Sequence, residues 1–434
     1  MTISNINKLA LFGGDPSFKK ELSTFNSLGD EELSAVNDVM LSGQLSGYYG
    51  SWSPEFYGGI KVKQLEKEWS KTFKCEHSIA VNSNTSGLLA AMGAIGLSPG
   101  DEVILPPLSM SATAIAPLFY GGVPVFCDVE PVTCTLDPDK VEKLITKRTK
   151  AIIVVNLFGH IAYLSKLRQI ADKFNLYLIE DNAQAPLGHE DGNLAGTVGD
   201  IGIFSLNYHK HFHTGEGGVC VTNNEQLAKK LQLIRNHGEN CVNEINVDDQ
   251  VNTIGLNLRM TELCAAIGLE QLKKSEYLVQ ERVEIANFLN NNLNDLPGIN
   301  LPIQRPNSKA VYYMYQIRFE ENVVGVSRER FAEALAAEGF PTFLGFIKPL
   351  YLLPVFQNKI AIGSQGWPFK RYKGFLSIFN KKISYKKGIC PVAEKLHEKE
   401  LMGFDCCCLK INKDDLKGLS KAFKKVYEYR NQLK

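Results

Sequence analysis

The sequence predicts an α/β protein whose main sheet is mostly parallel and which carries a second, smaller α+β domain. From Ile79 to about Thr222, short apolar runs alternate with segments of helical periodicity, and Gly, Pro, Asp and Asn bound the runs. A long helical segment then separates this region from one with a different pattern. Strands that alternate with helices form a parallel sheet covered on both faces, with ligand sites at the carboxyl ends of the strands.

The elements of the first region follow in order along the chain. Short apolar runs of buried character predict strands at 78–81, 103–105, 125–127, 151–155, 176–179, 201–206 and 219–222. Helical spacing of apolar residues predicts the helices between them, at 88–95, 111–120, 138–145 and 164–174.

The second region begins after a proline-free helical segment at 260–292, which is too long for a simple crossover and is expected to link two domains. Strand, helix and strand are predicted at 312–319, 328–337 and 342–346, and a closing amphipathic helix at 416–429. We therefore expect a large domain over 1–290 and a small domain over 291–434. Residues 1–40 are expected to pack on the small domain, and 354–390 to form an irregular insertion.

Composition excludes several classes of partner. The 434 residues include 48 Lys and Arg against 47 Asp and Glu, a net charge of +1 that gives no reason to expect nucleic acid or an acidic membrane. No apolar run is long enough to span a bilayer, and the first residues lack the pattern of a signal peptide. The ten cysteines form no C-x-x-C pair and no zinc spacing, so we expect no metal and a cytoplasmic protein.

The segment around Lys210 is the most informative for chemistry. Lys210 lies in a turn-rich stretch between the strands predicted at 201–206 and 219–222, with Ser205 upstream and the glycine-rich 215–218 downstream. A lone lysine in a loop is usually a solvated charge. Glycines at such a place allow the backbone to approach a bound group closely, and a reactive lysine needs burial or a neighbouring cation to be neutral part of the time.

Asp181 follows an apolar strand, so its carboxylate should project at the carboxyl edge of the sheet. One interpretation is a helix N-cap. The other is a partner for the pyridine nitrogen of pyridoxal 5′-phosphate (PLP), since lysine, aspartate and serine at strand ends are what a PLP enzyme needs. Ala183 is small enough to lie under a flat ring, and Gln184 could reach its phenolic oxygen.

A Ser-Asn-Thr-Ser-Gly run at 83–87 opens the helix predicted at 88–95. Free backbone N–H groups and the positive end of the helix dipole suit a phosphate there. Because nearly every helix begins with such residues, this signal gains weight only together with Ser205. The flanking His209, His211 and His213 could tune the lysine, contact substrate or be structural, and the run Cys406–Cys408 favours packing over metal binding.

In these motifs, taken in their order, the chain resembles the DegT/StrS-type sugar aminotransferases, PLP enzymes of the aspartate aminotransferase fold (fold type I). The resemblance covers almost the full length and extends to residues 100–106 and 255–260. It implies that Lys210 forms the Schiff base, Asp181 contacts the pyridine nitrogen and Gln184 the hydroxyl. It also implies a homodimer with shared active sites, and it assigns the phosphate to Asn84, Thr85, Ser205 and, from the neighbouring subunit, Asn257.

The chain departs from the family pattern at two places. Met110 stands where the family usually has an aromatic ring stacked on the cofactor, and a thioether covers a ring less rigidly. The segment 346–351 lacks a histidine often found there. One branch of the family has histidine at the place of Lys210 and dehydrates sugars, so the lysine favours transamination.

The expected function is transfer of an amino group, from L-glutamate, to a keto or aldehyde sugar in polysaccharide or secondary-metabolite biosynthesis. A loop at 43–52, rich in hydroxyls, glycine and aromatic rings, suits a sugar or is an ordinary flexible loop. Residues 11–14 and the segment after 350 resemble the branch that acts on cyclitols, aminobenzoate-type precursors or octulosonate sugars, so a nucleotide-linked substrate is not assumed. PLP-dependent sugar dehydration and a non-catalytic PLP or sugar sensor remain alternatives.

Overall fold

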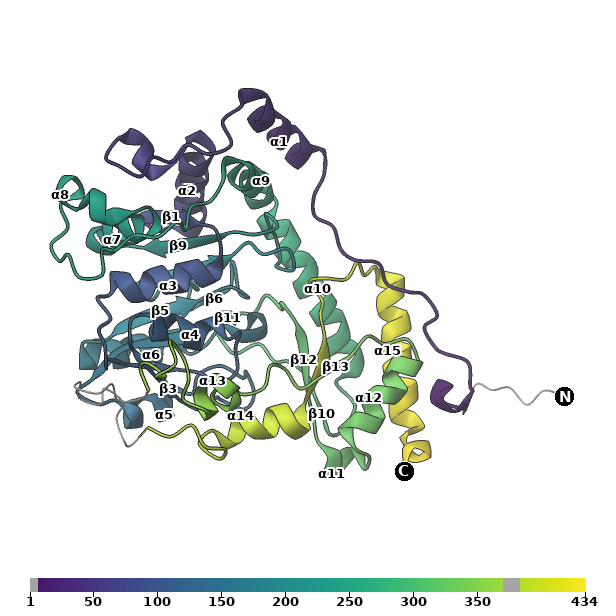
Figure 1. Cartoon of the computed structure of the whole chain (residues 1–434). Coiled ribbons are helices and arrows are strands. Elements are labelled where there is room, and N and C mark those ends of the chain that lie inside the picture. The colour runs from purple at the N-terminus through teal and green to yellow at the C-terminus, as the bar shows by residue number, and fades with distance from the viewer. Residues whose placement is uncertain (1–6, 370–382) are drawn as a thin grey trace.

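The computed structural model describes residues 7–369 and 383–434 (Figure 1). Part of the predicted insertion at 354–390, and the first six residues, therefore lie outside the described residues. Within them the main sheet has seven strands. In spatial order they are β1 (His77–Val81), β9 (Gly218–Thr222), β8 (Ile201–Ser205), β5 (Tyr177–Asp181), β4 (Thr149–Val155), β2 (Glu102–Leu105) and β3 (Val123–Phe126). Only β9 runs against its neighbours, so the predicted mostly parallel sheet is confirmed.

Helices cover both faces of this sheet, and the alternation of side chains along the strands shows how. On β4, Ile152 and Val154 belong to one buried cluster, whereas Ile153 and Val155 belong to the other. The first cluster takes side chains from α2 (Ile60–Phe73), α6 (Leu164–Phe174) and α9 (Glu262–Lys273). The second takes them from α3 (Asn84–Ala94), α4 (Ala112–Phe119) and α7 (Glu225–Arg235).

The single helix predicted over 260–292 is wrong, because the chain breaks at Lys274 into α9 and α10 (Ser275–Leu293). Ser275 Oγ donates to the carbonyl of Leu272 at 2.7 Å, and Lys274 Nζ reaches the carbonyl of Ser27 at 2.8 Å. The break lets α9 pack on α1 (Asp30–Ser42) and α2 while α10 packs on α15 (Lys413–Glu428). The helix predicted at 138–145 likewise divides into α5 (Pro138–Val141) and a 3₁₀ turn.

The second sheet has the antiparallel order β10 (Ile299–Asn300), β12 (Tyr315–Phe319), β14 (Leu401–Phe404) and β13 (Phe343–Leu344). Helices α12 (Arg328–Ala337) and α15 pack together beside it (Figure 1). The predicted strand at 312–319 begins only at Tyr315, and the one at 342–346 shrinks to β13. Residues 312–314 do not join β12, because the backbone on either side of Tyr312 hydrogen-bonds to Phe158 and Gly159, beside the main sheet, instead.

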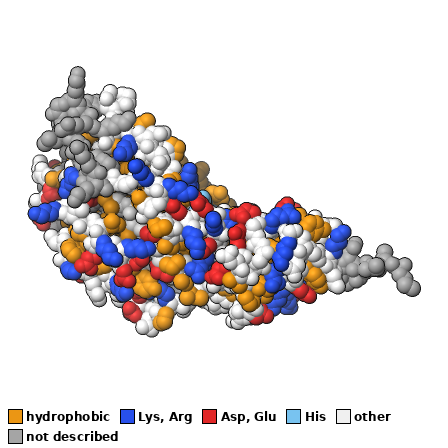
Figure 2. Space-filling view, turned by 90° about the horizontal axis from the view of Figure 1, so that it is seen from below, with side chains coloured by type: hydrophobic (Ala, Val, Ile, Leu, Met, Phe, Trp, Pro, Cys, Tyr) orange, Lys and Arg blue, Asp and Glu red, His pale blue; other side chains and the backbone are white. Residues whose placement is uncertain are grey.

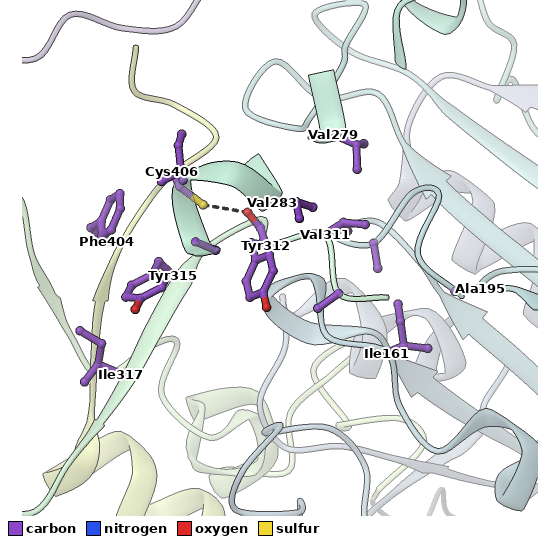
Figure 3. Packing of buried hydrophobic residues seen from close by; sticks show 14 of the residues in the cluster. Ile161, Ala195, Val279, Val283, Val311, Tyr312, Tyr315, Ile317, Phe404 and Cys406 are labelled. Atoms are coloured by element: carbon purple, nitrogen blue, oxygen red, sulfur yellow. Dashed lines mark hydrogen bonds between the residues drawn. The ribbon is translucent and has the colours of Figure 1, made fainter. Parts of the chain in front are cut away.

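The two sheets are joined through a shared core rather than a loose linker. Val311 N donates to the carbonyl of Gly159 at 2.9 Å. Gly159 has φ +86°, and a Cβ there would lie 2.5 Å from Tyr312 N, so only glycine allows this approach. Figure 3 shows Tyr312 near Val283 of α10 and Tyr315 of the second sheet, with Cys406 Sγ donating to its carbonyl at 2.7 Å.

The segment that follows β13 returns to the main sheet. Tyr385 Oη donates at 2.8 Å to the carbonyl of Pro124, a residue of the edge strand β3. Asp128 accepts from the backbone N–H groups of Val392 and Ala393 at the start of α14 (Pro391–Lys395). These bonds cover an edge that would otherwise present unpaired backbone groups.

The N-terminal residues 8–25 run along the small-domain side before α1 crosses to α9 (Figure 1). Phe18 N donates to the carbonyl of Glu338 at 3.0 Å, and Phe25 N to the carbonyl of Cys408 at 2.8 Å. Helix α10 itself spans the boundary predicted near 290. That division of the chain stays a prediction.

Acidic and basic side chains are interleaved on the face seen in Figure 2, and no large area there carries a single sign. In the described ranges no helix combines the length and the apolar character required to cross a membrane.

Glu338 should hold the N-terminal residues in place. Its carboxylate is fully buried and accepts from Ala10 N and Ser17 N, both at 2.8 Å, while Lys425 Nζ lies 2.9 Å away. Glu338→Gln removes the charge and leaves Lys425 with the carbonyl of Asp15 but no carboxylate partner, so we expect the free energy of unfolding to fall by about 2–3 kcal/mol. Denaturant unfolding measures this loss.

The matched control is Glu333→Gln on α12, whose side chain is 53% exposed in a surface pair with Arg330. We expect a change within about 0.5 kcal/mol there. Equal losses in both variants would contradict the role given to Glu338.

Candidate functional site

A cavity of about 330 Å³ lies at the carboxyl ends of β5 and β8, where the sequence places the reactive groups. All but one of the predicted site residues line it: Asn84, Thr85, Met110, Asp181, Ala183, Gln184, Ser205 and Lys210. The exception is Asn257, which is exposed and does not line this cavity.

Lys210 lies in the loop between β8 and β9. Its backbone N–H donates to the carbonyl of Asn207 at 2.9 Å, which closes a turn, and its Nζ lies 4.2 Å from the ring centre of Tyr313. Burial lowers the pKa of Lys210, and the negative charge of Asp181 opposes this in part. The amine therefore loses its proton more readily than a solvent-exposed lysine.

Asp181 ends β5 with a buried carboxylate. Thr113 Oγ1 donates to Oδ2 at 3.0 Å, and Asn84 Nδ2 donates to Oδ1 at 3.2 Å. Burial raises the pKa of Asp181, whereas these hydrogen bonds lower it. The alternative of a helix N-cap is wrong, because residues 182–188 form turns and no helix follows.

The start of α3 forms one end of the cavity. Ser83 caps the helix by accepting from Ser86 N at 3.1 Å, and Asn84 and Thr85 are its first residues. Gly218 opens β9 so close by that a Cβ there would lie 2.6 Å from the carbonyl carbon of Ser83. The approach brings β8, which ends in Ser205, beside the positive end of the helix dipole.

The side chain of Asn84 is used differently from the expectation. Its amide contacts Asp181, so in this geometry the backbone of α3, rather than that amide, is placed to meet a phosphate. Ser205 Oγ accepts from Asn207 N at 3.2 Å and keeps its own O–H for a ligand.

Three further predicted residues complete the lining. Gln184 Oε1 accepts from Phe158 N at 2.7 Å, which leaves the Nε2 donor for a ligand. Ala183 adds little bulk beside Asp181, and its N–H lies 3.4 Å from Oδ1. Met110 is 55% exposed and borders the cavity, and its thioether accepts only a long bond of 3.8 Å from the neighbouring Ser111 Oγ.

The sequence analysis missed two contacts of the reactive pair. Thr113 lies in the first turn of α4, which packs on α3, β2 and β3, and its hydroxyl meets Asp181 at the end of β5. Tyr313 comes from the start of the small domain, about a hundred residues from Lys210. Thr113 lies only three residues beyond Met110, which is the one signal that could have indicated it, whereas nothing in the local sequence around Tyr313 points to the cavity.

Of the three histidines near Lys210, only His209 lines the cavity. Burial lowers the pKa of His211 to about 3, so its neutral ring donates from Nε2 to the carbonyl of Val311 at 2.9 Å. His213 accepts from Gly215 N through Nδ1 at 3.3 Å. His211 and His213 therefore make hydrogen bonds to the backbone of the chain and do not line the cavity.

The donor set fits PLP. The cavity holds an amine, a buried carboxylate across from it and an open helix N-terminus, and the buried Oδ1 atoms of Asn84 and Asn207 have no partner in the described chain. The described residues contain no group of three or more His, Cys, Asp or Glu side chains arranged to hold a metal ion.

Comparison with known proteins agrees with this geometry. Residues 27–368 match the model of the DegT/DnrJ/EryC1/StrS aminotransferase family. The chain is 32% identical to the spore coat polysaccharide biosynthesis protein SpsC of Bacillus subtilis, over 81% of this chain and 90% of that protein. It is 31% identical to the L-glutamine:2-deoxy-scyllo-inosose aminotransferase of Streptomyces kanamyceticus, over 98% of each.

Among solved structures, S. venezuelae DesV in complex with a ketimine intermediate superposes with a TM-score of 0.76 and 26% identity, over 92% of this chain and 94% of that chain. The lysine and aspartate at the strand ends, the length of the family match and this shared architecture lead to one conclusion. The chain belongs to the PLP-dependent DegT/DnrJ/EryC1/StrS aminotransferase family.

Proposed function

We propose that this protein transfers an amino group from L-glutamate to the carbonyl of a keto or aldehyde sugar, or of a cyclitol, in polysaccharide or secondary-metabolite biosynthesis. The observation that carries the proposal is the buried Lys210 amine in one cavity with the buried Asp181 carboxylate. Such a pair is what proton transfer beside a bound PLP ring requires.

In this proposal Lys210 is the acid and base, and it would move a proton between the donor's α-carbon and the C4′ carbon of a bound PLP. Its neutral amine takes a proton from the carbon that bears the donor's amino group and later gives one back, and its lowered pKa makes that form accessible. PLP, when bound, supplies the electron sink that accepts the pair left on that carbon. Asp181 keeps the ring nitrogen positive, and Gln184 donates from Nε2 to the ring hydroxyl.

The remaining residues orient the cofactor. The first turn of α3, with Asn84 and Thr85, and the hydroxyl of Ser205 are placed for the phosphate. Ala183 and Met110 are placed for contact with the ring. Because Met110 is half exposed and flexible, orientation depends more on Asp181 than on stacking.

L-Glutamine is the second candidate donor, and a cyclitol is a specific candidate acceptor. Relatives named L-glutamine:2-deoxy-scyllo-inosose aminotransferase match 97–98% of this chain, including the segment after residue 350, whereas SpsC matches 81%. Offering either amino acid to the enzyme in turn, with the same acceptor, separates the two donors.

We also propose a homodimer with shared active sites. Helix α1 buries Ala35 and Val39 against Ala266 of α9 but leaves Leu33, at 60% exposure, and Leu41, at 87% exposure, uncovered. An apolar helix face without a partner is typical of an interface.

All ten cysteines are free, which supports the cytoplasm as the compartment.

Replacing the catalytic amine tests the reaction. Lys210→Ala should lower amino-sugar formation by at least about a thousandfold, because it removes the amine that moves the proton, while circular dichroism stays unchanged. In the native enzyme the rate should fall as the pH falls through the lowered pKa of Lys210, since the protonated amine cannot accept a proton. Mass spectrometry of the product measures both effects.

The exposed Lys417, in a surface pair with Asp414, provides the control, and Lys417→Ala should keep full activity. A deoxysugar formed without gain of nitrogen would indicate dehydration instead. A native protein that binds PLP but turns over neither donor would indicate a sensor.

The hydroxyl of Thr113 should lower the pKa of Asp181. Thr113→Val removes the hydroxyl that donates to the carboxylate, so the pKa of Asp181, already raised by burial, should rise further. The neutral acid cannot pair with the ring nitrogen, so we expect the dissociation constant of PLP to increase about tenfold, and more at lower pH. Absorbance titration of the apoprotein measures it, and Thr113→Ser, which keeps the hydroxyl, should bind nearly as the native protein does.

The dimer is tested on α1. Leu41→Lys places a charge on the uncovered face and should shift the protein from dimer to monomer in sedimentation velocity at micromolar concentration. Phe119→Lys, at an equally apolar position of 61% exposure on α4, is the control and should stay dimeric. A native protein that sediments as a monomer would contradict the proposal.

A further inference from the structure

A second cavity, of about 690 Å³, lies between the N-terminal segment, α10 and the start of α15, which are neighbours in Figure 1. It shares no lining residue with the cavity around Lys210. A β-bridge between Thr24 and Leu409 fixes its N-terminal wall to the small domain. Beside this bridge, Phe25 N donates to the carbonyl of Cys408 at 2.8 Å. A cavity of this volume has room for a small molecule.

Arg282, on α10, lines this second cavity with a buried guanidinium that makes no hydrogen bond in the described chain. Its side chain is 2% exposed, and its Nε and Nη2 atoms are both buried without a partner. These two atoms form one edge of the guanidinium, which can donate two parallel hydrogen bonds to an oxyanion. Glu281 Oε2 lies 3.8 Å from Nη2, which is too far for a hydrogen bond, and it also lacks a partner. The ring of Phe25, with its centre 4.0 Å from Cζ, holds the guanidinium in place but offers no such acceptor.

Other buried arginines of the chain are held by hydrogen bonds. Arg235 donates to Glu66 and Arg328 to Glu329, and both also donate to backbone carbonyls. Arg282 is the exception among the three arginines buried in the described ranges. A buried charge without such partners is costly, so the open edge of Arg282 indicates a ligand that supplies the acceptors.

Positive charge prevails among the side chains around this cavity, with four cations against three carboxylates. Lys20 Nζ donates to both oxygens of Asp415 at 2.8 Å, so these two charges balance. Lys410 and Lys413, which are exposed, form no ion pair within the described residues. Glu284 is exposed as well, so solvent and salt screen its charge. The guanidinium and these two lysines thus favour an anion of more than one charge.

Apolar side chains form much of the remaining lining. Ile285 and Phe288 follow Arg282 on α10 at intervals of three residues, and Leu416 lies on α15. The cavity therefore suits a ligand with a charged end and an apolar body.

We propose that this second cavity binds a phosphate monoester, whose oxygens accept from the Nε and Nη2 edge of Arg282 and whose apolar body packs on Phe288. The ligand takes the place of Glu281 Oε2 beside that edge, and Lys410 and Lys413 add positive charge at the mouth. A phosphate monoester carries about two negative charges and three free oxygens, which matches one arginine and two lysines better than a single carboxylate does. This inference goes beyond the proposed aminotransferase reaction and does not depend on the homodimer.

Calorimetric titration with phenyl phosphate tests the site on the holoenzyme, in which PLP already occupies the cavity around Lys210. Arg282→Met keeps most of the side-chain length and removes the charge, so the dissociation constant of phenyl phosphate should rise at least about tenfold. The variant breaks no hydrogen bond of Arg282 and removes a buried charge without a partner, so the fold should persist. Circular dichroism checks the fold.

Two further variants test the site without replacing a buried residue. Glu281→Gln removes the carboxylate that competes for Arg282 and should lower the dissociation constant about threefold. Lys413→Ala removes a cation from the lining and should raise it about threefold. Lys417→Ala, one turn further along α15 and outside the lining, is the matched control and should leave it unchanged.

The outcomes are distinct. Weaker binding by Arg282→Met, with opposite shifts in Glu281→Gln and Lys413→Ala, supports the site, and the opposite shifts alone decide if Arg282→Met does not fold. No binding by the native holoenzyme, or binding that none of these variants changes, overturns it. Tighter binding of benzoate than of phenyl phosphate overturns the phosphate assignment. Turnover by Arg282→Met should equal that of the native enzyme, so failure of this inference leaves the proposed reaction intact.

Discussion

The burial of two opposite charges at one edge of a parallel sheet is the constraint on which the rest of this molecule depends. Burial raises the pKa of Asp181 and lowers that of Lys210, so each group is pushed toward its neutral form. Their mutual attraction and the donors on Asp181 oppose this push. The lowered pKa of the amine makes its neutral form, which takes up a proton, more accessible than in a solvent-exposed lysine.

The scaffold supports that pair from both domains. Parallel pairing of β5 with β4 and β8 fixes the point where Asp181 projects. The ring of Tyr313 lies against Lys210 because Val311 is bonded to Gly159 two residues earlier. The small domain thus forms part of the cavity wall, and loosening the contact at Gly159 would change the setting of the catalytic amine as well as the stability of the domain contact.

The main sheet and the position of Asp181 could be predicted, because both depend on patterns within short stretches of the sequence. The alternation of apolar strands with helices predicted the main sheet, and a carboxylate after the strand at 176–179 indicated Asp181. The break at Lys274 could not be predicted, because it depends on bonds to residues about 250 positions away, such as Ser27. Tyr313 and the amide of Asn84 were out of reach for the same reason, since their contacts come from tertiary packing.

The same limit applies to the substrate. Asn257 is exposed and does not line the cavity of its own chain, so the role that the resemblance gives it depends on the proposed homodimer. Lys210, Asp181 and the first turn of α3 line the cavity, whereas Met110 stands where the family usually has a stacked ring. The buried pair, rather than ring stacking, therefore orients the cofactor in the proposed enzyme.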